Sequence, residues 1–149
     1  MTDDLKQLLQ RELLLSADAA QVLAYSFDKC SRVGLKKEYT PEELESFESL
    51  CSRFARLSDI LTQKLFRLFD ELALETPGSV RDRINRAEKR GIIEQAEDFV
   101  AIRILRNDIA HEYLPEAIRD IYRKVMALTP VLLKTVDLAK RYSQEEFSI

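Results

Sequence analysis

Hydrophobic residues recur with the period of an α-helix along almost the whole chain, and no stretch keeps the alternation expected of a half-buried strand. The first helical pattern runs from about Asp4 to Arg32, and Gly34 follows it as a suitable C-cap residue. The second begins at the capping box Thr40-Pro41-Glu42-Glu43 and continues to about Leu74. The pattern therefore predicts two long helices in the first half of the chain.

Three further helices are expected after a break at residues 75–79, which include a proline and a glycine. The first is short and basic, from Val80 to Arg90, and Gly91 is placed to end it. The second runs from Glu94 to about Tyr113, and the third from Glu116 to about Tyr142.

The last helix has two features that we expect to weaken it. Pro130 lies inside it, and a proline removes one helical hydrogen-bond donor and clashes with the preceding turn, so we expect a kink or a split. The residues from Ser143 to Ile149 are expected to form a frayed tail. The sequence thus predicts an all-α fold, an antiparallel up-down four-helix bundle with an extra short helix, built as one domain from residues 1–149.

The composition agrees with a globular helical domain. Of the 149 residues, 46% are hydrophobic and 33% are charged, and a chain of this length buries enough surface to fold without disulfides or metals. The net charge of −3 argues against a polyanion-binding surface over the whole molecule, so nucleic acid would have to meet a local basic patch. The basic helix from Val80 to Arg90 is either such a phosphate-binding patch or a solvated charged face.

The cysteines and the ends of the hydrophobic runs bear on the cellular compartment. Cys30 and Cys51 lack metal-ligand spacing and are expected to be small buried residues with reduced thiols. The chain starts with acidic residues instead of the basic start of a signal peptide, and no apolar run has the length of a membrane span. We therefore expect a cytoplasmic protein without a membrane segment.

The polar residues that could do chemistry are concentrated between Arg106 and Tyr113, a stretch that reads Arg-Asn-Asp-Ile-Ala-His-Glu-Tyr. His111 is the only histidine in the chain. Arg103, Asn107 and His111 follow one another at intervals of four and form a polar line along the helix, whereas Arg106 lies about 140° around the helix from His111. Tyr113 is expected on nearly the same side as Arg106.

These side chains suit phosphate chemistry on an outward helix face, since Ile102, Leu105 and Ile109 occupy the opposite, core-facing side. Arginine offers a forked set of donors to phosphate oxygens, and an imidazole titrates near neutral pH. One histidine with scattered carboxylates provides no metal-ligand set, so neither a metal nor another cofactor is expected. The lack of a phosphate-cradling glycine loop and of a Gly-x-Ser-x-Gly elbow argues against nucleotide and acyl hydrolases.

The divergence of Arg106 and His111 has a consequence for the oligomeric state. One helix does not aim both side chains at the same phosphate. A second copy related by a two-fold axis is the simplest way to supply the missing group, and it would bring two arginines and two histidines into one cleft. The geometry therefore predicts a homodimer with a composite site.

The spacing Arg106-x4-His111-x-Tyr113 resembles the R-x4-H-x-Y motif of HEPN domains. The chain looks most similar to the toxin subunits encoded beside minimal nucleotidyltransferase antitoxins, and its Gly91-Ile92-Ile93 segment resembles the turn before the motif helix in that family. The resemblance implies a four-helix up-down bundle that acts as a homodimer. It also implies cleavage of RNA without a metal, by attack of the ribose 2′-hydroxyl on the adjacent phosphate, which leaves a cyclic phosphate.

The same resemblance implies roles for individual residues. His111 would transfer protons, and Arg106 would stabilise charge on the phosphate. Asn107 matches the polar residue that often follows the motif arginine. Tyr113 matches the tyrosine that the partner nucleotidyltransferase adenylylates to silence the toxin. Arg103 is added as a supporting residue from its place on the helix face alone.

Two alternatives to a ribonuclease remain open. The chain could be a catalytically silent subunit that binds a nucleotidyltransferase. It could also be a plain helical interaction module in which the Arg-Asn-Asp stretch forms a surface ion-pair network. Growth arrest and RNA cleavage that are lost in His111→Ala would separate the ribonuclease from the silent subunit.

Overall fold

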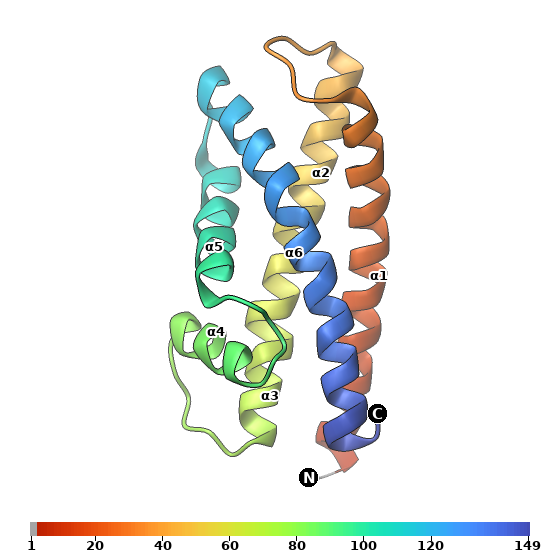
Figure 1. Cartoon of the computed structure of the whole chain (residues 1–149), viewed down its shortest axis with the longest axis vertical. Coiled ribbons are helices and arrows are strands. Elements are labelled where there is room, and N and C mark those ends of the chain that lie inside the picture. Colours follow the sequence, from red (N-terminus) through yellow and green to blue (C-terminus); the bar gives the residue numbers. More distant parts are fainter. Residues whose placement is uncertain (1–2) are drawn as a thin grey trace.

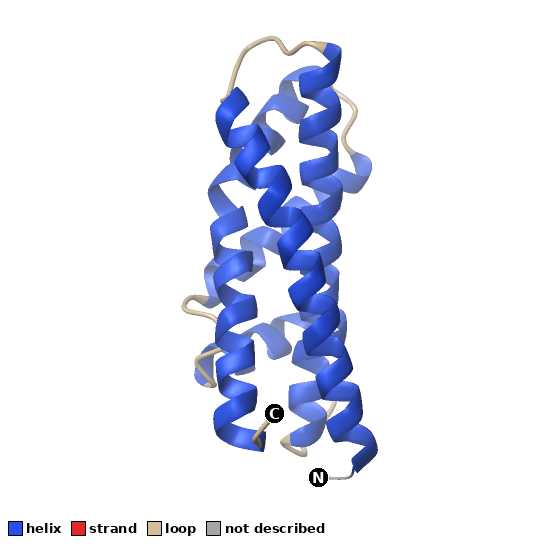
Figure 2. Cartoon of the chain, turned by 90° about the vertical axis from the view of Figure 1, so that its right-hand side faces the viewer, coloured by secondary structure: helices blue, strands red, loops and turns tan. Residues whose placement is uncertain are grey.

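The computed structural model describes residues 3–149, and every regular element in that range is a helix. Figure 1 shows α1, α2, α5 and α6 side by side along the long axis of the molecule, with the short α4 at one end of α5 and next to α3. The view in Figure 2, turned by 90°, shows the long helices aligned with the same axis. The prediction of an all-helical fold is confirmed. The elements are α1 (Asp3–Val33), α2 (Pro41–Asp59), the π-helical segment η1 (Ile60–Leu65), α3 (Phe66–Leu72), α4 (Val80–Lys89), α5 (Ala96–His111) and α6 (Pro115–Phe147).

Local end signals place several helix ends where the sequence predicts them. The Thr40 hydroxyl accepts a hydrogen bond from the Glu43 amide at 3.2 Å, and the Glu43 carboxylate accepts one from the Thr40 amide at 2.9 Å, which completes the predicted capping box. Gly34 and Gly91, with φ of +81° and +75°, adopt the left-handed conformation that glycine tolerates best, just beyond α1 and α4. These interactions explain why the predicted and observed positions agree for the end of α1, the start of α2 and the end of α4.

The helix predicted from Thr40 to Leu74 is continuous as far as Leu72, but it contains the π-helical segment η1, which the hydrophobic period does not reveal. A π-helical turn is wider than an α-helical turn and changes the backbone hydrogen bonding. The Thr62 hydroxyl within it donates to the Ser58 carbonyl at 2.7 Å, and Arg83 of α4 donates to the Thr62 carbonyl at 3.5 Å. We call α2, η1 and α3 together, residues 41–72, the central rod.

The last helix is more regular than the sequence predicts. α6 runs from Pro115 to Phe147 without interruption, so of the kink or split predicted at Pro130 the split is wrong. Val125 and Leu132, on either side of the proline, are both completely buried. Packing on both sides therefore holds the helix together across the backbone hydrogen bond that the proline removes.

The predicted frayed tail is also wrong. Ser143 is completely buried and donates to the Ala139 carbonyl at 2.8 Å. Tyr142 packs edge-on against Phe69 of α3 at 5.1 Å between ring centroids, and Phe147 packs edge-on against Tyr142 at 6.0 Å. Aromatic packing of this kind keeps the end of α6 attached to the central rod.

Two of the remaining sequence predictions concern the cysteines and the membrane. Cys30 and Cys51 are both buried and both free, as predicted. Among residues 3–149, no helix combines the length and the apolar character that crossing a bilayer requires.

Ion pairs dock the basic helix α4 onto the central rod. Asp70 is 6% exposed and accepts hydrogen bonds from Arg86 at 3.0 Å and from Arg90 at 2.5 Å. Arg83 bonds to η1, as described above, and Arg81 pairs with a glutamate of α5 at 2.8 Å. The prediction of a solvated charged face is therefore wrong for Arg86 and Arg90, and these arginines serve packing within the chain instead of forming an open phosphate-binding patch.

Replacing Asp70 by Asn tests this docking. The change leaves Arg86 and Arg90 with only the more distant and more exposed Glu75 as a shared negative charge, and we expect the free energy of unfolding to fall by about 1–3 kcal/mol. Urea denaturation followed by circular dichroism measures it. The matched control is Glu97→Gln, which removes the exposed ion pair with Arg81 and should change the free energy of unfolding by less than about 1 kcal/mol. Equal losses in the two variants would contradict the docking role.

Candidate functional site

Helix α5 carries the motif, and its core-facing side is as predicted. Ile102 and Leu105 are at most 2% exposed, and Ile109 is partly buried against the core. On the opposite side, Ile104 is 59% exposed, and Asn107 and His111 are exposed as well. Spacings of three and seven residues place these last three on one side of a helix. We call them the outward face of α5.

The structure turns Arg103 and Arg106 away from the outward face and toward Asp59, the last residue of α2. Arg103 donates from Nη1 to Asp59 Oδ1 at 2.8 Å. Arg106 binds with two nitrogens, from Nε to Oδ1 at 2.9 Å and from Nη2 to Oδ2 at 3.0 Å. Such forked pairs are among the stronger polar contacts in proteins. The prediction that both arginines share an outward face with Asn107 and His111 is therefore wrong.

The shared carboxylate sets the electrostatics of this cluster. Partial burial raises the pKa of Asp59, but the hydrogen bonds from Arg106 and Arg103 outweigh it, so its pKa lies below the ordinary value. The hydrogen bonds to Asp59 raise the pKa of Arg106 in turn. One carboxylate between two guanidiniums leaves one positive charge unbalanced.

Arg106 keeps donors that Asp59 does not use. Its bonds to Asp59 come from Nε and Nη2, and Nη1 makes no hydrogen bond to any residue in the range 3–149. A guanidinium has five N–H donors in a rigid plane. Asp59 therefore orients Arg106 while leaving part of it available to an anion.

The end of α5 differs from the prediction, and this affects Tyr113. The helix stops at His111, and Glu112 takes an extended backbone conformation, with φ of −90° and ψ of 135°. The Glu112 Oε1 atom accepts hydrogen bonds from the amides of Tyr113 and Leu114, both at 3.1 Å. Tyr113 is 83% exposed. The prediction that Tyr113 lies on the same side as Arg106 assumed that the helix continues through residue 113. Because α5 ends at His111, that prediction no longer follows from the helical geometry.

Asn107 and His111 stay unengaged within one chain. Over the described residues, neither side chain forms a hydrogen bond or an ion pair. The structure thus brings Arg103 and Arg106 together on Asp59 but does not couple them to the imidazole. His111 is left available to solvent, a ligand or a second copy.

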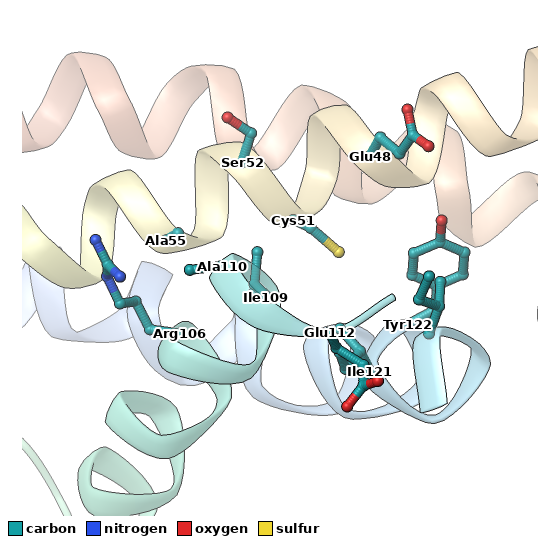
Figure 3. A pocket seen from close by; sticks show the side chains of 11 residues that line it. Glu48, Cys51, Ser52, Ala55, Arg106, Ile109, Ala110, Glu112, Ile121 and Tyr122 are labelled. Atoms are coloured by element: carbon teal, nitrogen blue, oxygen red, sulfur yellow. The ribbon is translucent and has the colours of Figure 1, made fainter. Parts of the chain in front are cut away.

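A pocket of about 440 Å³ opens beside Arg106, between α2, the end of α5 and the start of α6. Figure 3 shows Arg106 at one end of it and Glu48 of α2 and Tyr122 of α6 at the other. Cys51 and other apolar or small side chains lie between the two ends, and Glu112 also lines the pocket. His111 does not line this pocket.

Sequence reasoning missed Asp59, Glu48 and Tyr122. Asp59 lies 47 positions before Arg106 and reaches it only through the packing of α5 on α2. Glu48 and Tyr122 stand on helical patterns without any local motif around them. No signal in the sequence alone marks these three residues as neighbours of the motif.

Neither a metal site nor a relative identifies the site. Residues 3–149 contain no group of histidine, cysteine or acidic side chains that could hold a metal ion. No family model, no curated protein and no solved structure matches the chain. The functional argument therefore depends on the residues of the site themselves.

The Asp59→Asn variant tests the electrostatics of the arginine cluster. Because the folded pKa of Asp59 is lowered, its contribution to stability is complete above the unfolded pKa of about 3.9 and is lost as the pH falls through the folded pKa. We expect the variant to be less stable than the wild type by about 1–2 kcal/mol at pH 7, and the difference to shrink below about pH 4. Urea denaturation at pH 7, 5, 3 and 2 measures this.

Asp137→Asn is the matched control, since Asp137 is exposed on α6 and makes no ion pair with the described residues. A stability difference for Asp59→Asn that persists unchanged at pH 2, or that Asp137→Asn reproduces, would disprove the shared-carboxylate account.

Proposed function

We propose that the chain is a metal-independent endoribonuclease of the HEPN toxin type that acts as a homodimer in the cytoplasm. The observation that carries the proposal is a pre-oriented arginine and a free histidine at the end of one helix. Arg106 is held by Asp59 with its Nη1 unbonded, and His111 is exposed. Charge stabilisation and proton transfer at a phosphate need such groups.

The proposal includes the bundle arrangement of that family, in which α1, α2, α5 and α6 run antiparallel, up and down. Short connections support it, because residues 34–40 join α1 to α2 and residues 112–114 join α5 to α6. Figure 1 draws the start of α1 and the end of α6 at the same end of the molecule, as an even number of antiparallel long helices requires.

The proposed dimer pairs the outward faces of two α5 helices. Ile104 offers an exposed apolar contact at one end of this face, and Asn107 and His111 follow it along the helix without partners among the described residues. A two-fold axis through such a face presents the same patch twice. In the proposal, His111 of one copy works with Arg106 of the other at the edge of the paired faces, because the two side chains diverge within one helix and Arg106 turns toward Asp59.

The proposed reaction uses these groups in one displacement. The ribose 2′-oxygen bonds to the adjacent phosphorus while the bond to the 5′-oxygen breaks, which gives a 2′,3′-cyclic phosphate and a 5′-hydroxyl end. A proton leaves the 2′-hydroxyl and another reaches the 5′-oxygen, and His111 carries at least one of these transfers. Arg106 stabilises the charge that builds up on the phosphate oxygens, with Arg103 and Asn107 in supporting positions.

The partner in this proposal is a minimal nucleotidyltransferase that acts as antitoxin. Tyr113 would be its target, and the 83% exposure of Tyr113 supports access by a second protein. In that modification the tyrosyl oxygen bonds to the α-phosphorus of ATP and pyrophosphate leaves.

A catalytically silent subunit that binds the nucleotidyltransferase is the second candidate. The observation in its favour is that both Arg103 and Arg106 are engaged with Asp59. Because both arginines help to attach α5 to α2 through Asp59, their presence is explained even if the protein does not cleave RNA. Activity of purified protein on RNA separates the two candidates.

We expect His111→Ala and Arg106→Ala each to lower the rate of RNA cleavage by about 100-fold or more, because one removes the proton carrier and the other a stabilising cation. Denaturing gels of a labelled RNA, run in the presence of EDTA, measure the rate. Arg119→Ala, which removes an exposed arginine of α6, is the control and should cleave like the wild type. Wild-type protein that leaves RNA intact would refute the enzyme and favour the silent subunit.

Mixing the two inactive variants extends this test to the dimer. If Arg106 and His111 of one site come from different copies, an equal mixture should recover about a quarter of the wild-type rate, since half the dimers are mixed and each has one intact site. No recovery, with mixed dimers present by native mass spectrometry, would place both groups of a site on one copy.

Tyr113 modification gives a separate prediction. After incubation with ATP and a minimal nucleotidyltransferase, the intact mass should rise by one or more AMP units, and Tyr113→Phe should abolish the gain. Tyr25→Phe is the control, because Tyr25 is also well exposed, at 64%, but lies on α1. A gain that survives in Tyr113→Phe would exclude this tyrosine as the target.

A further inference from the structure

The pocket beside Arg106 contains an unsatisfied polar group that points to a ligand. Tyr122 is 3% exposed, yet its hydroxyl makes no hydrogen bond with any residue from 3 to 149. No polar side-chain atom that is fully shut off from solvent lacks a partner in that range, so this hydroxyl keeps some contact with solvent, and Tyr122 is one of the residues that line the pocket. A buried tyrosine hydroxyl normally finds a partner.

The ring of Tyr122 is held in place by its neighbours. It stacks on Phe47 of α2 at 4.7 Å between centroids and meets Tyr39 edge-on at 5.7 Å. Burial is the largest cause that raises the pKa of Tyr122 to about 12, so the hydroxyl stays protonated at neutral pH and remains a hydrogen-bond donor. The pocket therefore offers a rigidly placed O–H group.

Charged groups divide the pocket into two unlike ends. Arg106, with its unused Nη1, stands at one end. Glu48, which makes no hydrogen bond with described residues, lies near Tyr122 at the other end (Figure 3). Small or apolar side chains, among them Ala55 and Ile109, line the wall between them. Glu112 also lines the pocket, and its Oε1 atom already accepts hydrogen bonds from the Tyr113 and Leu114 amides. A matching ligand has an anionic end, a flat apolar middle and an edge that offers donors to a carboxylate.

A guanine nucleotide has this order of groups. The Watson–Crick edge of guanine presents the O6 acceptor beside the N1–H and N2 amino donors, so a tyrosine hydroxyl and a carboxylate complement it side by side. Uracil presents one donor between two acceptors and would set an oxygen against the carboxylate. The pocket volume of about 440 Å³ lies in the range typical of small-ligand sites.

We propose that this pocket binds a guanine base of the RNA strand, with Tyr122 donating to O6, Glu48 accepting from N1 and N2, and Arg106 holding the adjoining phosphate. The proposal rests on the proposed ribonuclease function and deepens it, because the pocket would select the nucleotide next to the cleaved bond. Recognition of the base would then be separate from the chemistry at His111.

Calorimetric titration of the full chain with GMP and UMP tests the base preference without requiring cleavage. We expect GMP to bind at least about tenfold more tightly than UMP, and both Glu48→Gln and Tyr122→Phe to weaken GMP binding by about tenfold, as the loss of one hydrogen bond to a charged or buried group predicts. Glu45→Gln and Tyr25→Phe are matched controls on surfaces outside the pocket and should bind GMP like the wild type. Equal binding of GMP and UMP, or losses in the controls as large as in the pocket variants, would overturn the proposal.

Two further measurements separate this proposal from the proposed function and from a site for free nucleotides. RNA oligonucleotides with a single guanine or uracil at each position should be cut preferentially beside guanine, and Glu48→Gln should reduce that preference. GMP binding without any RNA cleavage would support the guanine site and refute the ribonuclease. RNA cleavage without a base preference would support the ribonuclease and refute the guanine site. GTP that binds more than about 100-fold more tightly than GMP, with no guanine preference in RNA, would make the pocket a free-nucleotide site and overturn the proposal.

Discussion

The sharing of one carboxylate between two arginines is the interaction on which the placement of α4 and α5 depends. Asp59 holds α5 through Arg103 and Arg106, and Asp70 holds α4 through Arg86 and Arg90. Both carboxylates belong to the central rod, and along the chain Asp59 precedes η1 and Asp70 follows it. One extra residue in a turn rotates all later side chains by about 100° about the helix axis. The π-helical segment therefore sets the direction of Asp70 relative to Asp59, and with it the positions of α4 and α5.

The cluster at Asp59 serves structure and chemistry at once. Taking a carboxylate and two guanidiniums partly out of water costs free energy, which the forked hydrogen bonds offset. As a result, the orientation of Arg106 is fixed before any anion binds. Preorganised donors of this kind are more effective toward developing charge than a flexible surface arginine, because no side chain has to be ordered during the reaction. The same cluster explains why a silent, structural role for the arginines stays a serious alternative.

The pocket beside Arg106 shows how distant segments build one site. Glu48 comes from the central rod, Arg106 from α5 and Tyr122 from α6, and the three are brought together only because these helices pack side by side. The outward face of α5, with Ile104 and His111, is a different surface that is open in one copy of the chain. In the proposed enzyme the pocket would select the base and the outward face would complete the reaction centre.

The sequence by itself determined the features that depend on near neighbours in the chain. The helical period, the capping box at Thr40 and the glycines at positions 34 and 91 act within a few residues, and they set the helices and most of their ends. Contacts over long sequence distances were decided by the tertiary structure alone. Packing keeps α6 whole across Pro130, and a carboxylate 47 positions away turns Arg106 inward. A helical wheel treats every polar side chain as facing water, and it has no means of representing a partner on another helix.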